Sequence, residues 1–204
     1  MTGNYLIGLD VGGGGGRCLL VNADTGETFS VFRAWTLPPD PAAGGFAFKL
    51  DTEAVWRVLG EAAREALQKA GAAPQEVAGV AAASMRHGLV AIDKKGKALL
   101  ATPNRDARAA EQAMGLAAER GEELYKITGH APNPIFMAAR LMWLKENRPD
   151  DFKSLHAALS ISDWVGYMLT GELASEPAQA AESLLFDLKS RKWANGVIKS
   201  LGLP

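Results

Sequence analysis

The residues of this chain that are best suited to chemistry lie together near its amino terminus. Asp10 precedes the glycine run Gly12–Gly16, and Arg17 follows it. Because glycine has no Cβ, successive backbone N–H groups can point into one concavity that suits a phosphate, and a neighbouring carboxylate can hold the accompanying Mg²⁺. The pattern predicts a nucleotide-binding hairpin with Asp10 as its catalytic metal ligand. Its predicted phosphate-binding residues are Gly12, Gly13, Gly14 and Arg17.

Two other phosphate-binding patterns do not fit this stretch. A dinucleotide-binding loop opens a helix, whereas Cys18–Val21 predicts a strand that leads into a turn at Asp24–Glu27. A Walker loop needs Gly-Lys-Ser or Gly-Lys-Thr after its glycines, and the sequence has neither. A flexible hairpin tip without a ligand is the remaining alternative. The flanking Asp10 and Arg17 argue against it.

The composition is that of a globular domain without attraction to polyanions. The chain has 204 residues, 48% of them apolar, which is enough to bury a proper core in one domain. Its formal net charge is −1 and its Lys and Arg residues are scattered, so we expect no nucleic-acid partner. No leader-like segment opens the chain and no apolar run reaches membrane-spanning length, so we expect no membrane partner.

The cysteine and histidine content predicts neither a disulfide nor a structural metal site. Cys18 is the only cysteine, and its place in an apolar strand predicts a buried, unreactive thiol, which fits a reducing cytoplasm. The three histidines, His87, His130 and His156, have no partner at metal-binding spacing.

The elements that must position these residues begin with three strands and a helix. Apolar runs separated by glycine-bearing turns predict an antiparallel meander with strands over 5–11, 17–22 and 27–35. A Pro- and Gly-rich loop over 36–48 follows. An amphipathic helix then starts at an Asp51 or Thr52 cap and ends at Gly71, and its apolar face should pack on the sheet.

The middle of the chain predicts further strands and the remainder predicts helices. Residues 77–83 suggest a buried parallel strand, and 89–93 pairs with 98–101 as a hairpin. Asn133 is the expected N-cap of a helix with Pro134 at its first position, and Ser162 caps another that closes at Gly171. The predicted helices cover 107–119, 122–128, 134–146, 162–169 and 193–201.

The hairpin and its surroundings resemble a known family. An Asp-x-Gly turn with Arg17 inside a βββαβ meander resembles the first phosphate loop of the actin and sugar kinase superfamily. Four later segments, in order, resemble the FGGY carbohydrate kinases, so that the likeness covers essentially the whole chain. Those segments are Ser84–Gly88, Asn104–Arg108, Thr128–Leu144 and Ser162–Glu172.

The resemblance implies a fold and a domain organisation. It implies an α/β actin-like or ribonuclease H-like ATPase fold, with a βββαβα-type mixed sheet and flanking helices. Residues 1–204 would be the N-terminal lobe of a two-lobed sugar kinase. The C-terminal nucleotide-binding domain, and with it the general base that takes the proton of the attacking hydroxyl, would lie beyond Pro204.

Within the family, the likeness to autoinducer-2 kinases is greatest. Ser84-Met85-Arg86, Asn104 in place of the usual Trp, and Asp106–Ala110 match that subfamily. His87 differs from its acidic residue and resembles the Met-His-Gly of xylulose kinases. Gly13 stands where the family usually carries a Thr or Ser hydroxyl for the γ-phosphate, and the loss of such a hydrogen bond is worth about 1.5–3 kcal/mol.

The resemblance also indicates a sugar site, although each residue has a plainer alternative. The implied substrate-binding residues are Arg86, His87, Asn104 and Asp106. Asp106 alone could be a helix N-cap, and His87 a structural histidine. The side chains expected outside the site are Arg105 and Arg108 on a solvated face, Asp163 in a first helical turn, and Met142, Trp143 and Trp164 in the core.

The function that follows is ATP- and Mg²⁺-dependent phosphorylation of a primary hydroxyl of a small sugar or polyol, resembling autoinducer-2 or a pentulose. The fragment by itself should be inactive because it lacks the base. A xylulose-type kinase is the alternative within the family, and a non-catalytic sugar- or nucleotide-binding module is the alternative outside catalysis. A chaperone-type ATPase is more distant. The sequence leaves open a homodimer.

Overall fold

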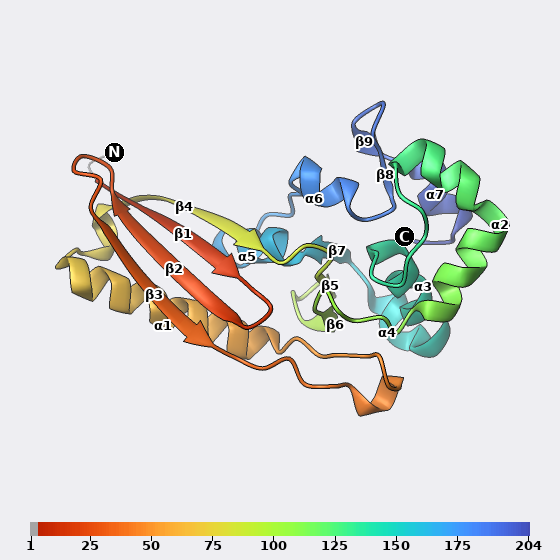
Figure 1. Cartoon of the computed structure of the whole chain (residues 1–204), viewed down its shortest axis with the longest axis horizontal. Helices are drawn as coiled ribbons and strands as arrows, with labels where there is room; N and C mark the ends of the chain where they lie inside the picture. The colour runs from red at the N-terminus through yellow and green to blue at the C-terminus, as the bar shows by residue number, and fades with distance from the viewer. Residues whose placement is uncertain (1–3) are drawn as a thin grey trace.

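A four-stranded mixed sheet forms one end of the molecule (Figure 1). The computed structural model describes residues 4–204. Strand order is β3-β2-β1-β4: the first three strands are the predicted antiparallel meander, and the fourth runs parallel to β1. The bounds are β1 (Tyr5–Val11), β2 (Gly15–Asn22), β3 (Thr28–Ala34) and β4 (Val77–Ser84).

The long helix α1 (Thr52–Ala70) covers one face of this sheet, as its amphipathic pattern predicts. Asp51 is the N-cap, and its side chain accepts a hydrogen bond from the backbone N–H of Ala54. Gly71 closes the helix in the left-handed conformation. Its buried residues, which pack against the inward side chains of β1 and β2, are Val55, Leu59, Ala62, Ala66 and Leu67.

Strand β4 corrects one prediction. Its parallel pairing with β1 is confirmed, but the strand is not buried: it lies at the sheet edge, and Val80 is 43% exposed. Within residues 4–204 no strand pairs with its outer edge. The residues of Val77–Ser84 are mostly apolar, yet none of them is fully buried in this chain.

A second, three-stranded sheet lies beside the first, in the order β6-β5-β7. The hairpin of β5 (Leu89–Ile92) and β6 (Ala98–Thr102) confirms the predicted pairing. Strand β7 (Ala157–Ser160), which sequence reasoning missed, pairs antiparallel with β5. All four residues of β5 are buried, because elements pack on both faces of this central strand.

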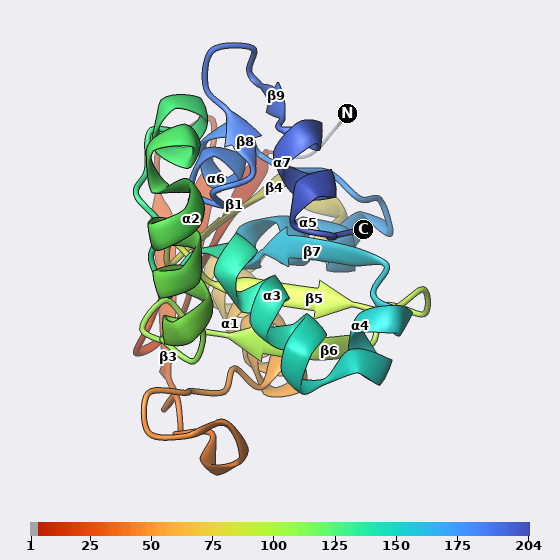
Figure 2. The same cartoon turned by 90° about the vertical axis from the view of Figure 1, so that its right-hand side faces the viewer.

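The rest of the chain is mainly helical and packs on the second sheet (Figure 2). Two of the predicted helices are one helix, α2, with a kink at Arg120, and Gly129 caps it as expected. The helices are α2 (Ala110–Thr128), α3 (Met137–Asn147), α4 (Pro149–Ser154), α5 (Ile161–Thr170), α6 (Pro177–Ala181) and α7 (Asn195–Ser200). The short elements are η1 (Pro41–Ala43), η2 (Pro74–Glu76), β8 (Phe186–Asp187) and β9 (Lys192–Trp193).

Four predicted helix starts were wrong. Helix α2 begins at Ala110 and not at residue 107. Helix α3 begins at Met137 after Phe136, while the Asn133 side chain instead accepts from the Ile135 N–H in the preceding turn. The cap of α5 is Ser160, which accepts from the Asp163 N–H. The last helix begins only at Asn195, because the chain first forms the β8–β9 hairpin. The residues predicted to open α2, α3 and α7 instead form turns or the β8–β9 hairpin, whereas α5 begins one residue earlier than predicted.

Predictions about the core were confirmed. Trp143 and Trp164 are buried, and Met142 is partly buried against the second core cluster. Cys18 has no exposed surface, and burial raises the pKa of its thiol to about 11. In the described part of the chain, no helix combines the length and apolar character needed to cross a bilayer.

Candidate functional site

The glycine turn between β1 and β2 is held by backbone hydrogen bonds and one tryptophan. The Gly12 N–H donates to the Gly15 carbonyl at 2.9 Å. Trp35 closes the turn from β3: its backbone N–H donates to the Gly14 carbonyl at 3.1 Å, and its indole N–H donates to the Gly12 carbonyl at 3.2 Å. Gly13 and Gly14, at the tip, are exposed. The backbone amides at the tip are therefore accessible to an anion.

The glycines of this run have two different structural causes. A Cβ on Gly15 would lie 2.4 Å from the Phe32 ring, and one on Gly16 would lie 2.7 Å from the Trp35 ring. Close packing against β3 therefore requires glycine at these two positions. A Cβ on Gly13 or Gly14 would meet nothing within 4 Å. The tip has room for a side chain or a ligand.

Asp10 and Arg17 flank the turn on the open face of the sheet. They are directly opposed in the antiparallel register of β1 and β2, so both side chains leave the same face, and both are exposed. The Arg17 guanidinium lies over the Phe32 ring at 5.8 Å. One exposed carboxylate beside open amides suits Mg²⁺, which keeps several waters and takes one or two protein carboxylates together with phosphate oxygens.

The loop after β4 starts at the same end of the sheet as the glycine turn. Val11 is aligned with Ser84, and the Met85 N–H donates to the Val11 carbonyl at 2.8 Å. Arg86 and His87 come immediately afterwards. Because β1 and β4 are parallel, their carboxyl ends lie side by side at one end of the sheet. The predicted phosphate residues therefore lie near Arg86 and His87.

Arg86 and His87 converge on a carboxylate that sequence reasoning missed. Glu182 Oε2 lies 3.3 Å from His87 Nε2, and Glu182 Oε1 lies 3.6 Å from Arg86 Nη1. Burial lowers the pKa of His87 and outweighs the opposing effect of the Glu182 charge. His87 also lies edge-on to the Phe136 ring. Nothing in the local sequence around Glu182 identifies it, since only the tertiary fold brings it to the loop.

The backbone of this loop is unusual for its residue types. His87 has a φ of 59°, in the left-handed region that few side chains adopt. At the next position, a Cβ on Gly88 would lie 2.1 Å from Ile161 Cδ1, so that close packing against α5 requires glycine there. This tight bend aims the His87 ring toward Glu182 and Phe136.

Arg140 connects the two candidate sugar loops by hydrogen bonds. Its side chain is fully buried on α3, and its guanidinium donates to the carbonyls of His87, Pro103 at 3.0 Å and Asp106 at 2.6 Å. Burial lowers the pKa of Arg140 to about 10. Sequence reasoning assigned no role to Arg140. The sequence signal that could have identified it is a charged residue among the apolar residues of a helix.

Asp106 is buried and bound by protein groups. Its carboxylate accepts from the backbone N–H of Phe48 at 2.7 Å and pairs with Arg108 at 2.9 Å. Arg108 also pairs with Asp40 at 3.3 Å and lies over the Trp143 ring, so the expectation that Arg108 lies on a solvated face was wrong. The carboxylate of Asp106 thus organises the loop and is not open to solvent.

The neighbouring arginine and asparagine have different surroundings. Arg105 stacks on the Phe48 ring at 3.9 Å and donates to the Leu37 carbonyl, which fixes the 36–48 loop. Asn104 is exposed, and its backbone carbonyl faces Arg140 at 3.5 Å. Of the four predicted sugar residues, the side chains of Arg86 and Asn104 are therefore accessible, that of His87 is mostly buried, and that of Asp106 is enclosed.

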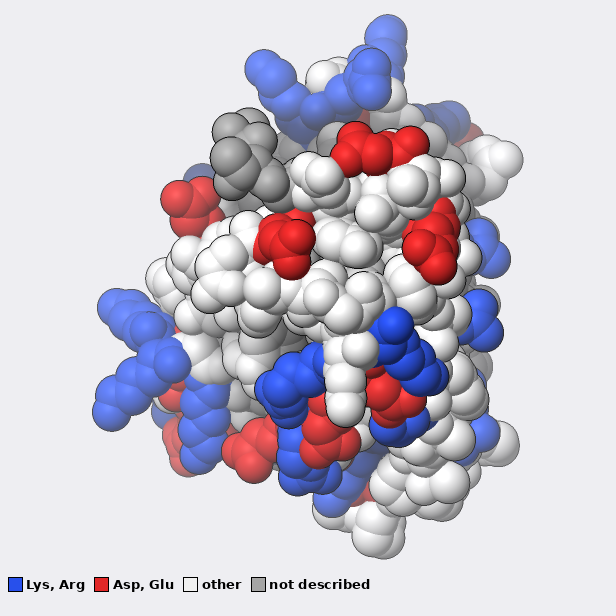
Figure 3. Space-filling view, turned by 90° about the vertical axis from the view of Figure 1, so that its left-hand side faces the viewer, with Lys and Arg blue, Asp and Glu red and all other residues white. Residues whose placement is uncertain are grey.

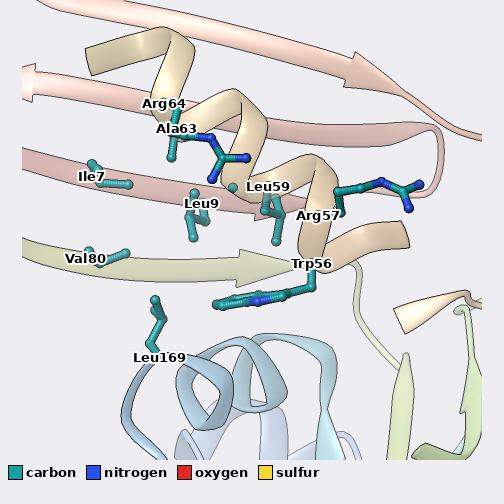
Figure 4. Close-up of a pocket in the computed structure, with 10 residues that line it drawn as sticks. Ile7, Leu9, Trp56, Arg57, Leu59, Ala63, Arg64, Val80 and Leu169 are labelled. Atoms are coloured by element: carbon teal, nitrogen blue, oxygen red, sulfur yellow. The ribbon is translucent and has the colours of Figure 1, made fainter. Parts of the chain in front are cut away.

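Two hollows lie beside strand β4. The apolar one, about 410 Å³, lies between α1, β1, β4 and α5 (Figure 4). Its wall residues Ile7 and Leu9 alternate with Asp10 along β1, so it lies on the sheet face opposite the Asp10 side chain. The larger hollow, about 630 Å³, contains Ser84, Asp163 and Gln179 and adjoins the His87 loop. Burial raises the pKa of Asp163, which is in the first turn of α5 as expected.

Surface charge near the sheet is mixed. On the face shown in Figure 3, basic and acidic side chains lie side by side around a broad uncharged area. On α1, such pairs include Lys69 with Glu65 and Arg57 with Glu61. The net charge of the chain is only −1, so any charge selectivity in the site comes from local groups rather than from an overall field.

The chain is similar to known proteins in sequence and in fold. Residues 5–204 match the family model described as the FGGY family of carbohydrate kinases, N-terminal domain. The autoinducer-2 kinase of Salmonella paratyphi B is 34% identical over 99% of this chain, which spans 38% of that relative's length.

Solved structures confirm the actin-like ATPase fold. A gluconate kinase from Lactobacillus acidophilus superposes with a TM-score of 0.86 at 22% identity, covering 98% of this chain and 40% of the other. A xylulose kinase from Rhodospirillum rubrum gives 0.83 at 24% identity, with 98% and 41% coverage. By its sequence match and its fold, the chain belongs to the FGGY family of carbohydrate kinases.

Proposed function

We propose that this chain is the sugar-binding lobe of a two-lobed kinase that transfers the γ-phosphate of ATP to a primary hydroxyl of a small linear sugar. One observation carries the proposal: the Asp10–Arg17 hairpin and the Arg86–His87 loop leave parallel strands at the same edge of one sheet. A phosphate donor and a polyol acceptor bound there would be adjacent. Phosphoryl transfer depends mainly on such positioning and on charge neutralisation.

Each residue has a separate task in this scheme. The open amides of Gly13 and Gly14 and the Arg17 guanidinium orient the phosphates. The Asp10 carboxylate would hold Mg²⁺, which would supply charge neutralisation to the phosphates. Arg86, His87 and Asn104 contact sugar hydroxyls, while Asp106 fixes the loop that carries Asn104. The general base would come from a second lobe, after Pro204.

The substrate class follows from the relatives and from two residues. Names among them include autoinducer-2 kinase, xylulose kinase and gluconate kinase. Asn104 presents an amide rather than an aromatic platform, which favours a short polar substrate such as an autoinducer-2-like compound. His87-Gly88 favours a pentulose of the xylulose type. A panel of both substrate types separates them. Cytoplasmic ATP would be the donor.

Substitution of Asp10 in the full-length protein tests the proposal. Asp10→Ala should lower kcat at least about 100-fold, because the metal loses its protein ligand. Asp24→Ala, in the exposed turn after β2, is the matched control and should retain activity. Unchanged folding is checked by circular dichroism. A kcat near the native value in Asp10→Ala would refute the metal role.

Arg86→Ala tests the sugar side. If Arg86 contacts the sugar, the KM for sugar should rise about tenfold or more, while the KM for ATP changes little. An equal rise in the KM for sugar and the KM for ATP would contradict a position of Arg86 in the sugar site.

A non-catalytic binding module is the second candidate, and Gly13 favours it because the turn has no hydroxyl at that position. Calorimetric sugar binding by the full-length protein, with no phosphorylated product from any substrate in the panel, would select it.

A further inference from the structure

The carboxylate of Glu182 balances the charge of the His87 loop. Its two oxygens are divided between two cation-forming side chains, Arg86 at 3.6 Å and His87 at 3.3 Å. Since burial keeps His87 mainly neutral at pH 7, the formal charges that remain are one positive, on Arg86, and one negative, on Glu182. The two cancel.

The fold holds Glu182 in a rigid turn. It is the C-cap of α6, and the Ser183 hydroxyl beside it donates to the Ala180 carbonyl and accepts from the Leu185 N–H. The Ser183 carbonyl in turn accepts from the Ala138 N–H of α3 at 3.1 Å. Leu184, fully buried, has a φ of 66°. Three hydrogen bonds of Ser183 therefore fix the backbone that carries Glu182.

The three side chains differ in their exposure to solvent. The Arg86 side chain is 71% exposed, that of Glu182 is 22% exposed, and that of His87 is 13% exposed. A ligand that reaches Arg86 from solvent therefore also meets an oxygen of Glu182. His87 Nδ1 is buried without a hydrogen-bond partner in the described chain.

From these contacts we infer that Glu182 is a specificity-determining residue that selects uncharged polyhydroxy compounds and disfavours ligands with a carboxylate or phosphate at this end. The inference rests on the proposed function. An unpaired arginine binds carboxylate or phosphate through parallel hydrogen bonds. Glu182 neutralises the charge of Arg86 and repels an incoming anion, whereas a hydroxyl can donate to the carboxylate and accept from Arg86.

A matched ligand pair tests this selectivity. Xylitol and xylonate differ by one terminal carboxylate, and their affinities for the full-length protein can be measured by calorimetry at low ionic strength, where charge effects are least screened. Native protein should prefer xylitol. In Glu182→Gln, the ratio of xylonate to xylitol affinity should rise at least about tenfold. In Glu182→Asp, which keeps the charge, it should rise much less.

The control variant is Glu172→Gln, in the loop before α6. Glu172 is exposed and forms no ion pair with Arg86 or His87 among residues 4–204. The affinity ratio should stay within about twofold of native. An NMR titration of the His87 imidazole adds a readout independent of any ligand: loss of the Glu182 charge should lower the pKa of His87 further.

The possible outcomes are distinct. A raised ratio in Glu182→Gln alone, with the shifted His87 titration, supports the inference. An unchanged ratio despite the shifted titration overturns the inference and leaves the sugar site standing. If neither ligand nor any sugar of the substrate panel binds native protein, the proposed function itself is refuted, and the inference with it.

Discussion

The two halves of the candidate site are built in different ways. The glycine turn consists of backbone groups and is open: Gly13 and Gly14 meet nothing at their Cβ positions. The sugar side is formed by side chains: Arg86 and Asn104 are exposed, while Arg140 and Asp106, which hold their loops, are fully buried. A phosphate needs accessible amides, whereas sugar selectivity needs side chains whose positions are fixed.

This difference shows where substitution is tolerated. In the turn, packing restricts Gly15 and Gly16, which face Phe32 and Trp35, while the tip is sterically free. Below the sugar loops, every polar partner of Arg140 is another part of the site. A substitution of Arg140 should therefore destabilise several loops at once. A substitution of Gly13 or Gly14 should affect only the turn.

The largest expected effect is at Arg140. Arg140→Met should lower the free energy of unfolding by about 3–5 kcal/mol, because it leaves Asp106 and the His87 and Pro103 carbonyls buried without this partner. Urea denaturation followed by fluorescence measures the loss. Arg86→Ala, with an exposed side chain, should change it by no more than about 0.5 kcal/mol. A loss below about 1 kcal/mol in Arg140→Met would show that the sugar side does not depend on its buried side chains for stability.

At the tip of the turn, a substitution is expected to increase catalytic efficiency with ATP. In the full-length kinase, Gly13→Thr should raise kcat/KM for ATP about 10- to 100-fold, because a hydroxyl can bind the γ-phosphate and the site has room for it. Gly13→Val has nearly the same shape without the hydroxyl and should give no gain. Equal effects of the two variants would contradict the hydrogen-bond explanation.

A smaller effect separates the tip from the base of the turn. Gly15→Ala should cost about 1–3 kcal/mol of stability, since the added Cβ overlaps the Phe32 ring and the Arg33 carbonyl. Gly14→Ala should be neutral or stabilise by up to about 1 kcal/mol through the unfolded chain. Thermal or urea unfolding of the two variants decides. If both lose the same stability, the packing argument is wrong.

The smallest effect is a pH dependence at His87. Its folded pKa lies below the ordinary value near 6.5, so the unfolded chain binds this proton more readily. Stability should therefore fall as pH drops from about 7 to 5.5, by less than about 1.4 kcal/mol per pH unit. His87→Gln should flatten this slope, and His156→Gln, at an exposed position, should not. An unaltered slope in His87→Gln would contradict the burial argument.

Sequence reasoning succeeded where neighbouring residues determine structure. The β1–β3 meander, α1 with its Asp51 cap and the glycine closures at Gly71, Gly129 and Gly171 follow from local pattern. It failed where distant segments compete. Strand β7 forms because β5 offers an open edge, and α3 starts late because the preceding residues form a turn.

The candidate site divides along the same line. The sequence by itself determined the glycine turn with Asp10 and Arg17, because such a turn needs only adjacent residues and backbone freedom. Only the tertiary structure decided that Glu182 faces Arg86 and His87, that Arg140 joins the loops, and that Asp106 and Arg108 are buried. Charged side chains bind whatever partner the fold brings within reach. Asp106 and Arg108 are neighbours in the chain, but the partners of Glu182 and Arg140 are distant in it.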